Sequence, residues 1–476
     1  MFSNLAPYPA IRPVCLPWLD TIPDTWRLAR AKEVLSPIDV RSRAGHEELL
    51  TVSSHRGVVS RSSETVTMFQ AVSYAGHKLC WPGDLVINSL WAWGRGLGVS
   101  SKHGIVSTAY GVYRPRPQAG LDARYLHELV RSDPFNWELT YRSRGVWKSR
   151  LQLTDDRFLT APMPIPPADE QAAIVKYLGH AHVRIDRAIA AKCKLIALLE
   201  EQKQAIIHQA VTRGLDPSVP LKDSGVPWLG EIPAHWSVAR LKDLAEVQTG
   251  LTLGKDYGAA QTSEYNYLRV ANVQSSSLDL REVTRVRVPA SEAERCTLRT
   301  GDVLMTEGGD IDKLGRSTIW TGEIEPCLHQ NHVFAVRCHE VLDPLYLVLM
   351  MSTPHGRQYF YTTAKKTTNL ASTNSTTLRA FGFHYPAVDE QRRIVAWLEE
   401  NTAGVVGVQS RAKREIDLLR EFRTRLTSDV VTGQVDVREI AATLPELTDD
   451  MLANTGDDAV DTELEDVEDF TEGEDD

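Results

Sequence analysis

Two long segments of the chain carry hydrophobic residues at the spacing of a helix. Residues 168–212 and 388–432 contain no proline and few glycines, and helix-favouring residues dominate both. A helix of about 45 residues would be about 65 Å long, too long for burial in one globular core. Their apolar positions match in pairs and keep one narrow stripe on a single face: Ile185 and Val405, Ile196 and Ile416, Leu199 and Leu419, Ile206 and Leu426, Ala210 and Val430. The pattern predicts two helices packed as a coiled coil.

The ends of these predicted helices carry further local signals. Asp169 and Asp389, each followed by glutamate, are predicted N-caps. Gly404 and Gly407 lie inside the second helix and each costs about 1 kcal/mol relative to alanine, so a kink there is possible. A coiled coil between two chains is the alternative arrangement, but the matched pairs favour an intramolecular one.

The matched helices belong to a longer internal repeat. A first set of residues recurs 210 positions later, and the stretch from Asp169 to Asp216 recurs 220 positions later. About ten residues are therefore inserted inside the second copy, and each copy has similar ends around a divergent interior. The first set pairs Pro17-Trp18-Leu19, Ile22-Pro23, Trp26 and Ala29-Arg30 with Pro227-Trp228-Leu229, Ile232-Pro233, Trp236 and Ala239-Arg240.

The interiors share only a skeleton of short elements. Gly83-Asp84 and Gly301-Asp302 predict turns that lead into buried strands, and Asp122 and Asp343 predict capped helix starts. Segments 106–113 and 332–336 are typical of strands. The fold class predicted is α+β, with two tandem mixed α/β domains, each followed by a long helix.

Composition narrows the class of protein. Hydrophobic content of 42% and charged content of 24% are typical of a soluble globular protein, and no run of eighteen apolar residues predicts a membrane span. The N-terminus does not resemble a secretory signal, and six dispersed cysteines without zinc spacing favour reduced thiols in a cytoplasm. Cys327, His329, His332 and Cys338 could suggest a metal cluster, but the alternating apolar residues around them favour strands, so we expect no metal.

The charge is unevenly distributed. The net charge is −10, yet residues 446–476 hold fifteen Asp or Glu and no Lys or Arg. Without them, 53 basic residues face 48 acidic ones, so the body carries +5. A mildly basic body with a separate acidic tail is compatible with nucleic-acid binding. The tail has two open interpretations, a role in solubility or competition with DNA for basic surfaces.

Two segments in each copy carry side chains suited to DNA, because Arg and Lys bind phosphate or guanine and Asn binds adenine. The first precedes the long helix, where Tyr141 aligns with Tyr361, and the second follows the Gly-Asp turn. Solvated basic loops are the alternative for both, and a core position is the alternative for Trp91 and Trp93. The candidates are Arg142, Arg144, Trp147, Lys148 and Arg150 with Lys365, Lys366, Thr368, Asn369 and Asn374 before the helices, and Arg95, Lys102, Lys313 and Arg316 after the turns, with Arg95 expected on a flexible glycine-rich loop.

Motifs of catalysis are weak. Asp133-Pro134-Phe135 lacks the second proline of an amino-methyltransferase loop, and no phosphate-binding GxxxxGK[ST] loop is present. We therefore predict a chain without catalytic, cofactor or metal residues of its own. A self-contained DNA-modifying enzyme and a protein scaffold that does not bind DNA remain alternatives.

The combination of repeated motifs resembles the HsdS family, the specificity subunits of Type I restriction-modification enzymes. The resemblance covers residues 15 to 436 and rests on Asp-Glu-Gln with Ile-Val before each long helix, and on Trp228 to Trp236. The first copy departs from the family at Asp20, where glycine is usual. The resemblance implies a cytoplasmic, non-catalytic subunit in which each divergent domain recognises one half of a bipartite DNA site.

The same resemblance implies the partners and the division of the chain. The helices would form an antiparallel spacer and dock two methyltransferase subunits, with restriction/translocase subunits completing the complex and no membrane involved. S-adenosylmethionine, ATP and Mg would be used by those partners. The expected parts are a target-recognition domain over 1–166, a spacer helix over 167–214, a second target-recognition domain with its linker over 215–385, a second spacer helix over 386–438, and a disordered acidic tail over 439–476.

Overall fold

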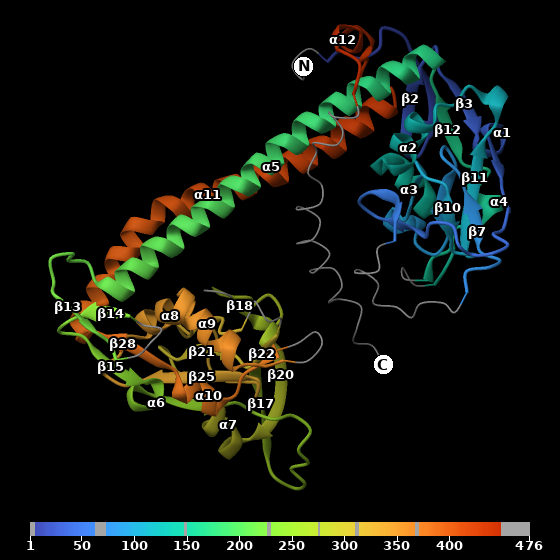
Figure 1. The fold of residues 1–476 in the computed structure, drawn as a ribbon. Helices are drawn as coiled ribbons and strands as arrows, with labels where there is room; N and C mark the ends of the chain where they lie inside the picture. The colour runs from blue at the N-terminus through green and yellow to red at the C-terminus, as the bar shows by residue number, and fades with distance from the viewer. Residues whose placement is uncertain are drawn as a thin grey trace. The chain divides into compact units, whose positions relative to one another are not determined.

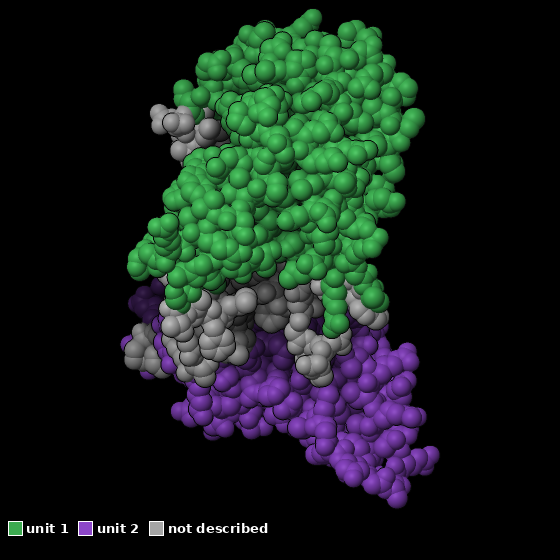
Figure 2. Space-filling model, turned by 90° about the vertical axis from the view of Figure 1, so that its right-hand side faces the viewer, with its two compact units in different colours: residues 1–194, 412–476 green, residues 195–411 purple. Residues whose placement is uncertain are grey.

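The chain groups into two compact units in a computed structural model (Figure 1). The model describes residues 5–61, 73–146, 150–225, 230–274, 277–309, 314–366 and 371–448. Unit 1 comprises residues 1–194 and 412–476, and unit 2 comprises residues 195–411, coloured green and purple in Figure 2. Each unit therefore combines one interior domain with parts of both long helices.

The two long helices are α5 (Ala168–Arg213) and α11 (Val388–Val431), as the hydrophobic spacing predicts. In unit 1, Arg423 donates to Asp186 at 2.9 Å, and His182 lies 3.0 Å from the Thr427 hydroxyl. In unit 2, Gln409 donates to the carbonyl of Ile196 at 3.3 Å. Residue numbers rise along one helix as they fall along the other, so the pair is antiparallel within each unit. The prediction of an intramolecular antiparallel pair is confirmed.

One local expectation for these helices is corrected. Asp169 and Asp389 are not N-caps, because the helices begin one residue earlier and the N–H of Gln171 already donates to the carbonyl of Pro167 at 2.9 Å. The two aspartates lie in the first turn, where a negative charge still favours the helix dipole. Helix α11 continues through Gly404 and Gly407, so the helix does not break there, and a kink at these glycines stays a prediction.

Each unit is built around a four-stranded antiparallel sheet of the same order. The sheets are β4-β11-β8-β9 in unit 1 and β16-β25-β21-β23 in unit 2. Their strands are β4 (Leu35–Pro37), β11 (Tyr110–Pro115), β8 (Leu85–Asn88) and β9 (Leu97–Val99), and β16 (Ala245–Thr249), β25 (Val333–Cys338), β21 (Val303–Thr306) and β23 (Ser317–Ile319). Helices α2 (Ala123–Arg131) and α8 (Pro344–Ser352) pack on these sheets in equivalent positions. The predicted mixed α/β plan is confirmed in both copies.

The remaining elements follow the same repeat, with exceptions in the interiors. Unit 1 contains β1 (Ile11–Leu16), β2 (Leu19–Pro23), β3 (Arg27–Arg30), α1 (Ala31–Val34), β5 (Leu50–Ser53), β6 (Gly57–Ser60), β7 (Lys78–Cys80), η1 (Ala92–Gly94), β10 (Gly104–Val106), η2 (Pro117–Ala119), α3 (Asp133–Arg142), α4 (Asp155–Phe158), β12 (Pro162–Ile165) and α12 (Arg438–Thr443). Unit 2 contains β13 (Leu221–Asp223), β14 (Glu231–Pro233), β15 (Ser237–Arg240), α6 (Leu241–Leu244), β17 (Thr262–Leu268), η4 (Val270–Asn272), β18 (Val273–Gln274), β19 (Ser277–Leu278), β20 (Thr284–Pro289), α7 (Ala290–Cys296), β22 (Gly308–Gly309), β24 (Cys327–His329), α9 (Pro354–Thr363), β26 (Lys365–Lys366), β27 (Ala371–Ser372), α10 (Ser375–Ala380) and β28 (Gly382–Tyr385). The strand expected over 106–113 is interrupted, because the N–H of Tyr110 closes a turn on the carbonyl of Ser107 at 3.1 Å.

The Gly-Asp turns are confirmed and have a second role. Gly83 and Gly301 have φ of 92° and 94°, a left-handed conformation that glycine adopts without strain. The aspartate after each turn is 1% exposed and receives two hydrogen bonds from one arginine, Asp84 from Arg114 at 2.7 and 2.8 Å and Asp302 from Arg337 at 2.9 and 2.7 Å. Each pair joins adjacent strands of the central sheet.

The repeated Glu-Gln pair in the first turn of each long helix ties that helix to its domain. In unit 1, Glu170 accepts hydrogen bonds from the indole of Trp26 at 2.8 Å and the hydroxyl of Thr25 at 3.0 Å. Gln171 accepts from the N–H of Asp122 at 2.7 Å and donates to the carbonyls of Gly120 and Pro166, both at 2.8 Å. We call this set of contacts the Glu-Gln clamp.

Unit 2 contains the same clamp. Glu390 accepts from the indole of Trp236 at 3.1 Å, and Gln391 accepts from the N–H of Asp343 at 2.8 Å. The Gln391 amide also donates to the carbonyls of Val341 and Pro386, both at 2.9 Å. The repeated tryptophan and Glu-Gln motifs therefore hold one frame in both copies.

Each domain also contacts the end of a helix from the other copy. The buried Tyr125 hydroxyl lies 2.9 Å from the carbonyl of Pro164 and 3.2 Å from that of Val431, at the end of α11. In unit 2, the Tyr346 hydroxyl lies 3.3 Å from the carbonyl of Val211 in α5. Unit 1 is therefore built from two separate stretches of the sequence, whereas unit 2 is one continuous stretch, residues 195–411.

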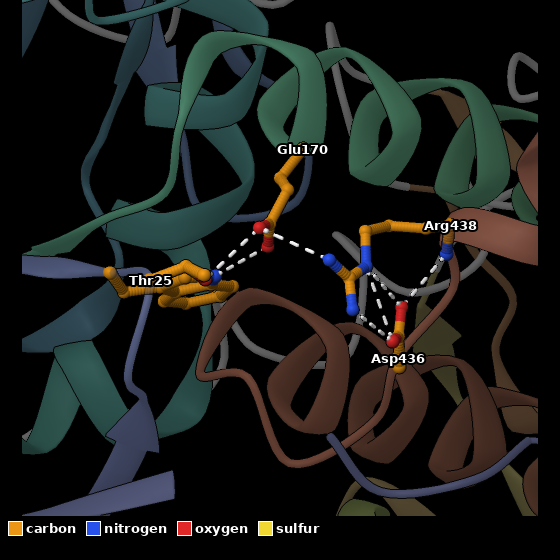
Figure 3. A network of polar contacts seen from close by, with 5 residues as sticks. Thr25, Glu170, Asp436 and Arg438 are labelled. Carbon is orange, nitrogen blue, oxygen red and sulfur yellow. Dashed lines mark hydrogen bonds and ion pairs between the residues drawn. The ribbon is translucent and has the colours of Figure 1, made fainter. Parts of the chain in front are cut away.

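Residues 438–448 correct the expectation of a disordered tail from residue 439. They form α12 and a following segment that packs on unit 1, with Ala441 buried and Leu444 against the core. Lys176 pairs with Glu446 at 2.7 Å. Figure 3 shows Arg438 between Asp436 and Glu170 beside Thr25. Residues 449–476 lie outside the described part.

Three of the four residues considered as metal ligands lie on strands, as expected, whereas His332 lies in the turn between β24 and β25. Cys327 and His329 belong to β24, Cys338 belongs to β25, and all six cysteines are free thiols. Among the described residues, no cluster of three His, Cys, Asp or Glu could hold a metal ion. No helix in the described ranges is long and apolar enough to cross a membrane.

Replacing the clamp glutamine should destabilise the unit that contains it. Gln391→Leu leaves the N–H of Asp343 and the carbonyls of Val341 and Pro386 without partners, at about 1–3 kcal/mol each. We expect unit 2 to lose about 3 kcal/mol or more, measured by chemical denaturation and localised by hydrogen exchange. The control Gln358→Leu, on the exposed surface of α9, should leave stability unchanged. Equal effects of the two variants would contradict the role of the clamp.

A buried histidine should make unit 2 sensitive to acid. Burial lowers the pKa of His384 from 6.5 to about 4, although its hydrogen bond to the carbonyl of Val211 opposes that shift. The unfolded chain then binds the proton more readily, so the stability contribution is complete above about pH 6.5 and decreases as the pH falls toward 4. His384→Gln, which keeps an N–H donor, should reduce the slope of stability against pH by up to one proton. An unchanged slope in this variant would contradict the role of His384.

Candidate nucleic-acid interface

The two candidate segments of each copy adjoin one another. In unit 1, the N–H of Leu153 donates to the carbonyl of Ser89 at 2.8 Å and joins the segment before α5 to the loop after β8. The equivalent bond in unit 2 runs from Thr373 to Glu307, also at 2.8 Å. In each domain a backbone hydrogen bond therefore joins segments that lie more than fifty residues apart in sequence.

In unit 1, a short loop presents two arginines to solvent. The backbones of Arg144 and Gln152 exchange hydrogen bonds at 3.0 and 2.9 Å and close the loop. Gly145 packs so tightly that a Cβ atom would lie 2.3 Å from the carbonyl oxygen of Arg150. Arg144 and Arg150 are exposed, and neither guanidinium has a hydrogen bond or ion pair with the described residues. Both are free to meet an anion.

Arg142 is placed differently, although it lies in the same segment. Its guanidinium donates to Glu138 at 2.5 Å and to the hydroxyl of Thr160 at 2.8 Å, and its side chain is 23% exposed. Glu138 is buried, so Arg142 neutralises a carboxylate within α3. We interpret Arg142 as a residue that positions the loop, whereas its predicted contact with DNA is untested.

Arg95 does not lie on a flexible loop, which corrects that expectation. It follows η1 in a left-handed conformation with φ of 61° and forms an ion pair with Asp133. Gly94 and Gly96 lie against Trp91, where added Cβ atoms would come within 2.3 and 2.9 Å of it. The glycines therefore allow close packing rather than mobility, and burial lowers the pKa of Arg95.

Lys102 lies at the opposite end of β9 from Arg95. Its ammonium pairs with Glu48 at 2.9 Å and with the hydroxyl of Ser60. The structure thus ties Lys102 to the β5–β6 hairpin and does not group it with Arg144 and Arg150.

In unit 2, a small sheet joins the candidate segments. Strand β27 pairs with both β22 and β26, so Ser372 lies opposite Gly308 on one side and Lys365 on the other. Lys365 is exposed. Asn374 caps α10, because its side-chain oxygen accepts from the N–H of Thr377 at 2.9 Å. That oxygen already has a structural partner.

Arg316 directly precedes β23. It is half-buried and lines a cavity of about 560 Å³ together with Arg357, Leu398 and Glu399. Trp147, Lys148, Lys313, Thr368 and Asn369 lie outside the described residues, as does the side chain of Lys366, and their contacts with DNA stay predictions.

Helix α3 carries an exposed aromatic pair that was not predicted from the sequence. Trp137 and Tyr141 lie on α3, are 45% and 70% exposed, and stack with ring centroids 5.5 Å apart. Their spacing of four residues on the polar face of a short helix was the available signal.

Comparisons with known proteins agree on one family. Residues 233–415 match the family model described as the Type I restriction modification DNA specificity domain. The chain is 27% identical over 189 residues to the type I restriction enzyme MjaX specificity subunit of Methanocaldococcus jannaschii, and 22% identical over 329 residues to the EcoKI specificity subunit of Escherichia coli. The alignments span 38% and 67% of this chain, and 43% and 67% of those relatives.

A solved structure shares the fold. A chain from a study of complex assembly and conformational transition of the type I R-M system superposes with a TM-score of 0.59 at 17% identity. The superposition covers 87% of this chain and 99% of that chain, so the shared fold includes both units.

The two unpaired arginines of unit 1 should contribute to binding of duplex DNA. Arg144→Ala with Arg150→Ala should weaken binding and lower the slope of log affinity against log salt by about one for each phosphate that is no longer bound. Arg124→Ala is the matched control, because Arg124 is 72% exposed at the far end of α2 from these segments. Fluorescence anisotropy at several salt concentrations measures both quantities. An unchanged slope in the double variant would contradict phosphate binding by these arginines.

Proposed function

The chain belongs to the Type I restriction-modification specificity subunits, and we propose from this premise that it is the DNA-recognition subunit of such a complex. Unit 1 would bind one half of a bipartite site and unit 2 the other. The proposal rests mainly on one observation: the two units share the same internal contacts but expose different side chains on the candidate surface. Both contain the same Glu-Gln clamp, whereas the surface that precedes each long helix differs in chemistry.

That contrast suits recognition of two unlike half-sites. At the loop before the helix, unit 1 presents Arg144 and Arg150, and unit 2 presents Lys365 on a three-stranded sheet. Phosphate contacts orient a protein on DNA, while base edges supply specificity. A common frame would hold both surfaces in equivalent orientations relative to their helices, and different side chains would select different bases.

The helices support the proposed docking of methyltransferase subunits. Besides the stripe between α5 and α11, they expose large apolar side chains to solvent. In unit 2 these include Leu198 at 54% and Val406 at 43%, and in unit 1 Leu418 at 63%. Exposed apolar residues on a surface helix are typical of protein interfaces. Restriction subunits would join the same complex.

The proposal assigns the chemistry to the partners. The chain would contribute no catalytic group, and S-adenosylmethionine, ATP and Mg would be bound by methyltransferase and restriction subunits. The complex would act in the cytoplasm, on chromosomal and incoming DNA. Family membership supports this assignment, and the role of the helix pair as a spacer stays a prediction.

Mapping of modified bases in the genome tests the proposed function. Cells that express this chain with its methyltransferase subunit should modify one bipartite motif with two unlike halves, and deletion of the chain should abolish the modification. Alanine replacement of Arg144 and Arg150 should impair modification through one half-site, whereas Lys365→Ala should affect the other. Each change alters one recognition surface and leaves the other intact.

Two outcomes would contradict this function. Unchanged modification without the chain would show that another subunit recognises the site. Methyl transfer by the isolated chain would show that it is itself an enzyme. Arg124→Ala, away from the candidate segments, is the control and should preserve the motif and its level of modification.

A further inference from the structure

Helix α3 of unit 1 exposes a stacked aromatic pair that no intramolecular packing explains. The rings of Trp137 and Tyr141 are nearly parallel, at 4°, and lie one helical turn apart. The indole N–H and the phenol have no hydrogen-bond partner among the described residues. Large side chains with one apolar face and one polar tip are typical of binding surfaces.

The opposite side of α3 is held rigidly. Phe135 and Leu139 are fully buried, and Phe135 packs edge-to-face on Trp18 at 5.8 Å. The side chain of Asn136 donates to the carbonyl of Trp93 at 3.2 Å. The aromatic pair is therefore presented by a fixed helix, so its ordering would cost little on binding.

The loop that follows α3 exposes apolar and basic side chains. Val146, in the loop after α3, is 91% exposed between the unpaired Arg144 and Arg150. The acidic residues of α3 are both neutralised, Asp133 by Arg95 and Glu138 by Arg142. An apolar surface beside free guanidiniums complements a polyanion that also offers flat apolar groups.

We propose that Trp137, Tyr141 and Val146 form an apolar DNA-contacting face of unit 1. The aromatic rings would pack on sugars and base edges of one half-site, and Arg144 and Arg150 would bind the flanking phosphates. This inference rests on the proposed function and adds the chemistry by which one unit binds its half-site. Because the guanidiniums of Arg144 and Arg150 are unpaired among the described residues, the expected partner is a polyanion such as duplex DNA and not an apolar protein surface.

Unit 2 lacks this face at the equivalent positions. Arg357 replaces Trp137 and lines the cavity beside α5 and α11, while Tyr361 matches Tyr141. Binding by unit 1 should therefore depend more on apolar contact, and binding by unit 2 more on charge. The two half-sites should differ in how salt affects their recognition.

Affinity measured against salt separates the two kinds of contact. The probe is a duplex that carries the mapped bipartite motif, and the protein is the full chain with its methyltransferase subunit. Trp137→Ala with Tyr141→Ala should weaken binding roughly 5- to 100-fold. The salt slope should not change, because an apolar contact releases no counterions. Trp137→Phe with Tyr141→Phe should retain most of the affinity and shows whether loss of the rings causes the effect.

A matched control and a direct readout complete the test. Ile11→Ala removes another exposed apolar side chain of unit 1, 53% exposed on β1, and should not change affinity. With 5-iodouracil in the duplex, photocross-links should form to Trp137 or Tyr141 in one half-site only. Circular dichroism of each variant excludes unfolding as the cause of weaker binding.

Three outcomes would overturn the inference in distinguishable ways. Wild-type affinity in the double alanine variant, with cross-links elsewhere, overturns it and leaves the proposed function intact. Weaker association of that variant with the methyltransferase in the absence of DNA shows that the face binds protein instead. Failure of the wild-type complex to bind the bipartite duplex overturns the proposed function itself.

Discussion

The Glu-Gln clamp is the interaction on which both units depend. Adjacent residues on a helix project about 100° apart, so one short motif can reach two different parts of a domain. Glu170 reaches the tryptophan after β2, and Gln171 reaches the N-terminus of α2. Both side chains are almost fully buried, at 3% and 1%, where an unpaired polar group would be costly. Replacement of either residue therefore removes several hydrogen bonds and leaves their buried partners unpaired.

The clamp operates in a chain whose compact units do not follow its tandem order. Unit 1 uses the start of α5 and the end of α11, and unit 2 uses the remaining parts. The contacts of Tyr125 with Val431 and of Tyr346 with Val211 are equivalent, although the first joins residues about three hundred positions apart. The N-terminal segment completes unit 1, where the N–H of Asp436 donates to the carbonyl of Ala6 at 2.8 Å. The boundaries of the sequence repeats therefore differ from the boundaries of the two compact units.

Periodic features could be predicted from the sequence, and features set by close packing could not. The long helices, the capped starts at Asp122 and Asp343 and the Gly-Asp turns follow from local spacing and residue preference. The prediction that Asp169 and Asp389 are N-caps was wrong. Each helix already includes the residue before the aspartate, which therefore lies in the first turn.

The candidate site was predictable only in part for a related reason. Sequence shows which side chains can bind an anion, but tertiary packing decides which of them already have a partner. The glycines around Arg95 indicated flexibility in sequence, yet they pack tightly against Trp91. The exposed pair of Trp137 and Tyr141 could not be predicted, because its exposure follows from the burial of Phe135 and Leu139 on the other side of α3.

Existing ion pairs within unit 1 also determine how strongly each of its basic residues could bind a DNA phosphate. A phosphate that approaches Lys102 or Arg142 must compete with Glu48 or Glu138, so the gain in binding is reduced by the loss of the existing ion pair. Arg144 and Arg150 have no such pair among the described residues, and they gain the whole interaction. The paired residues would therefore serve mainly to hold the surface in shape, and the unpaired arginines would be the ones that bind phosphate.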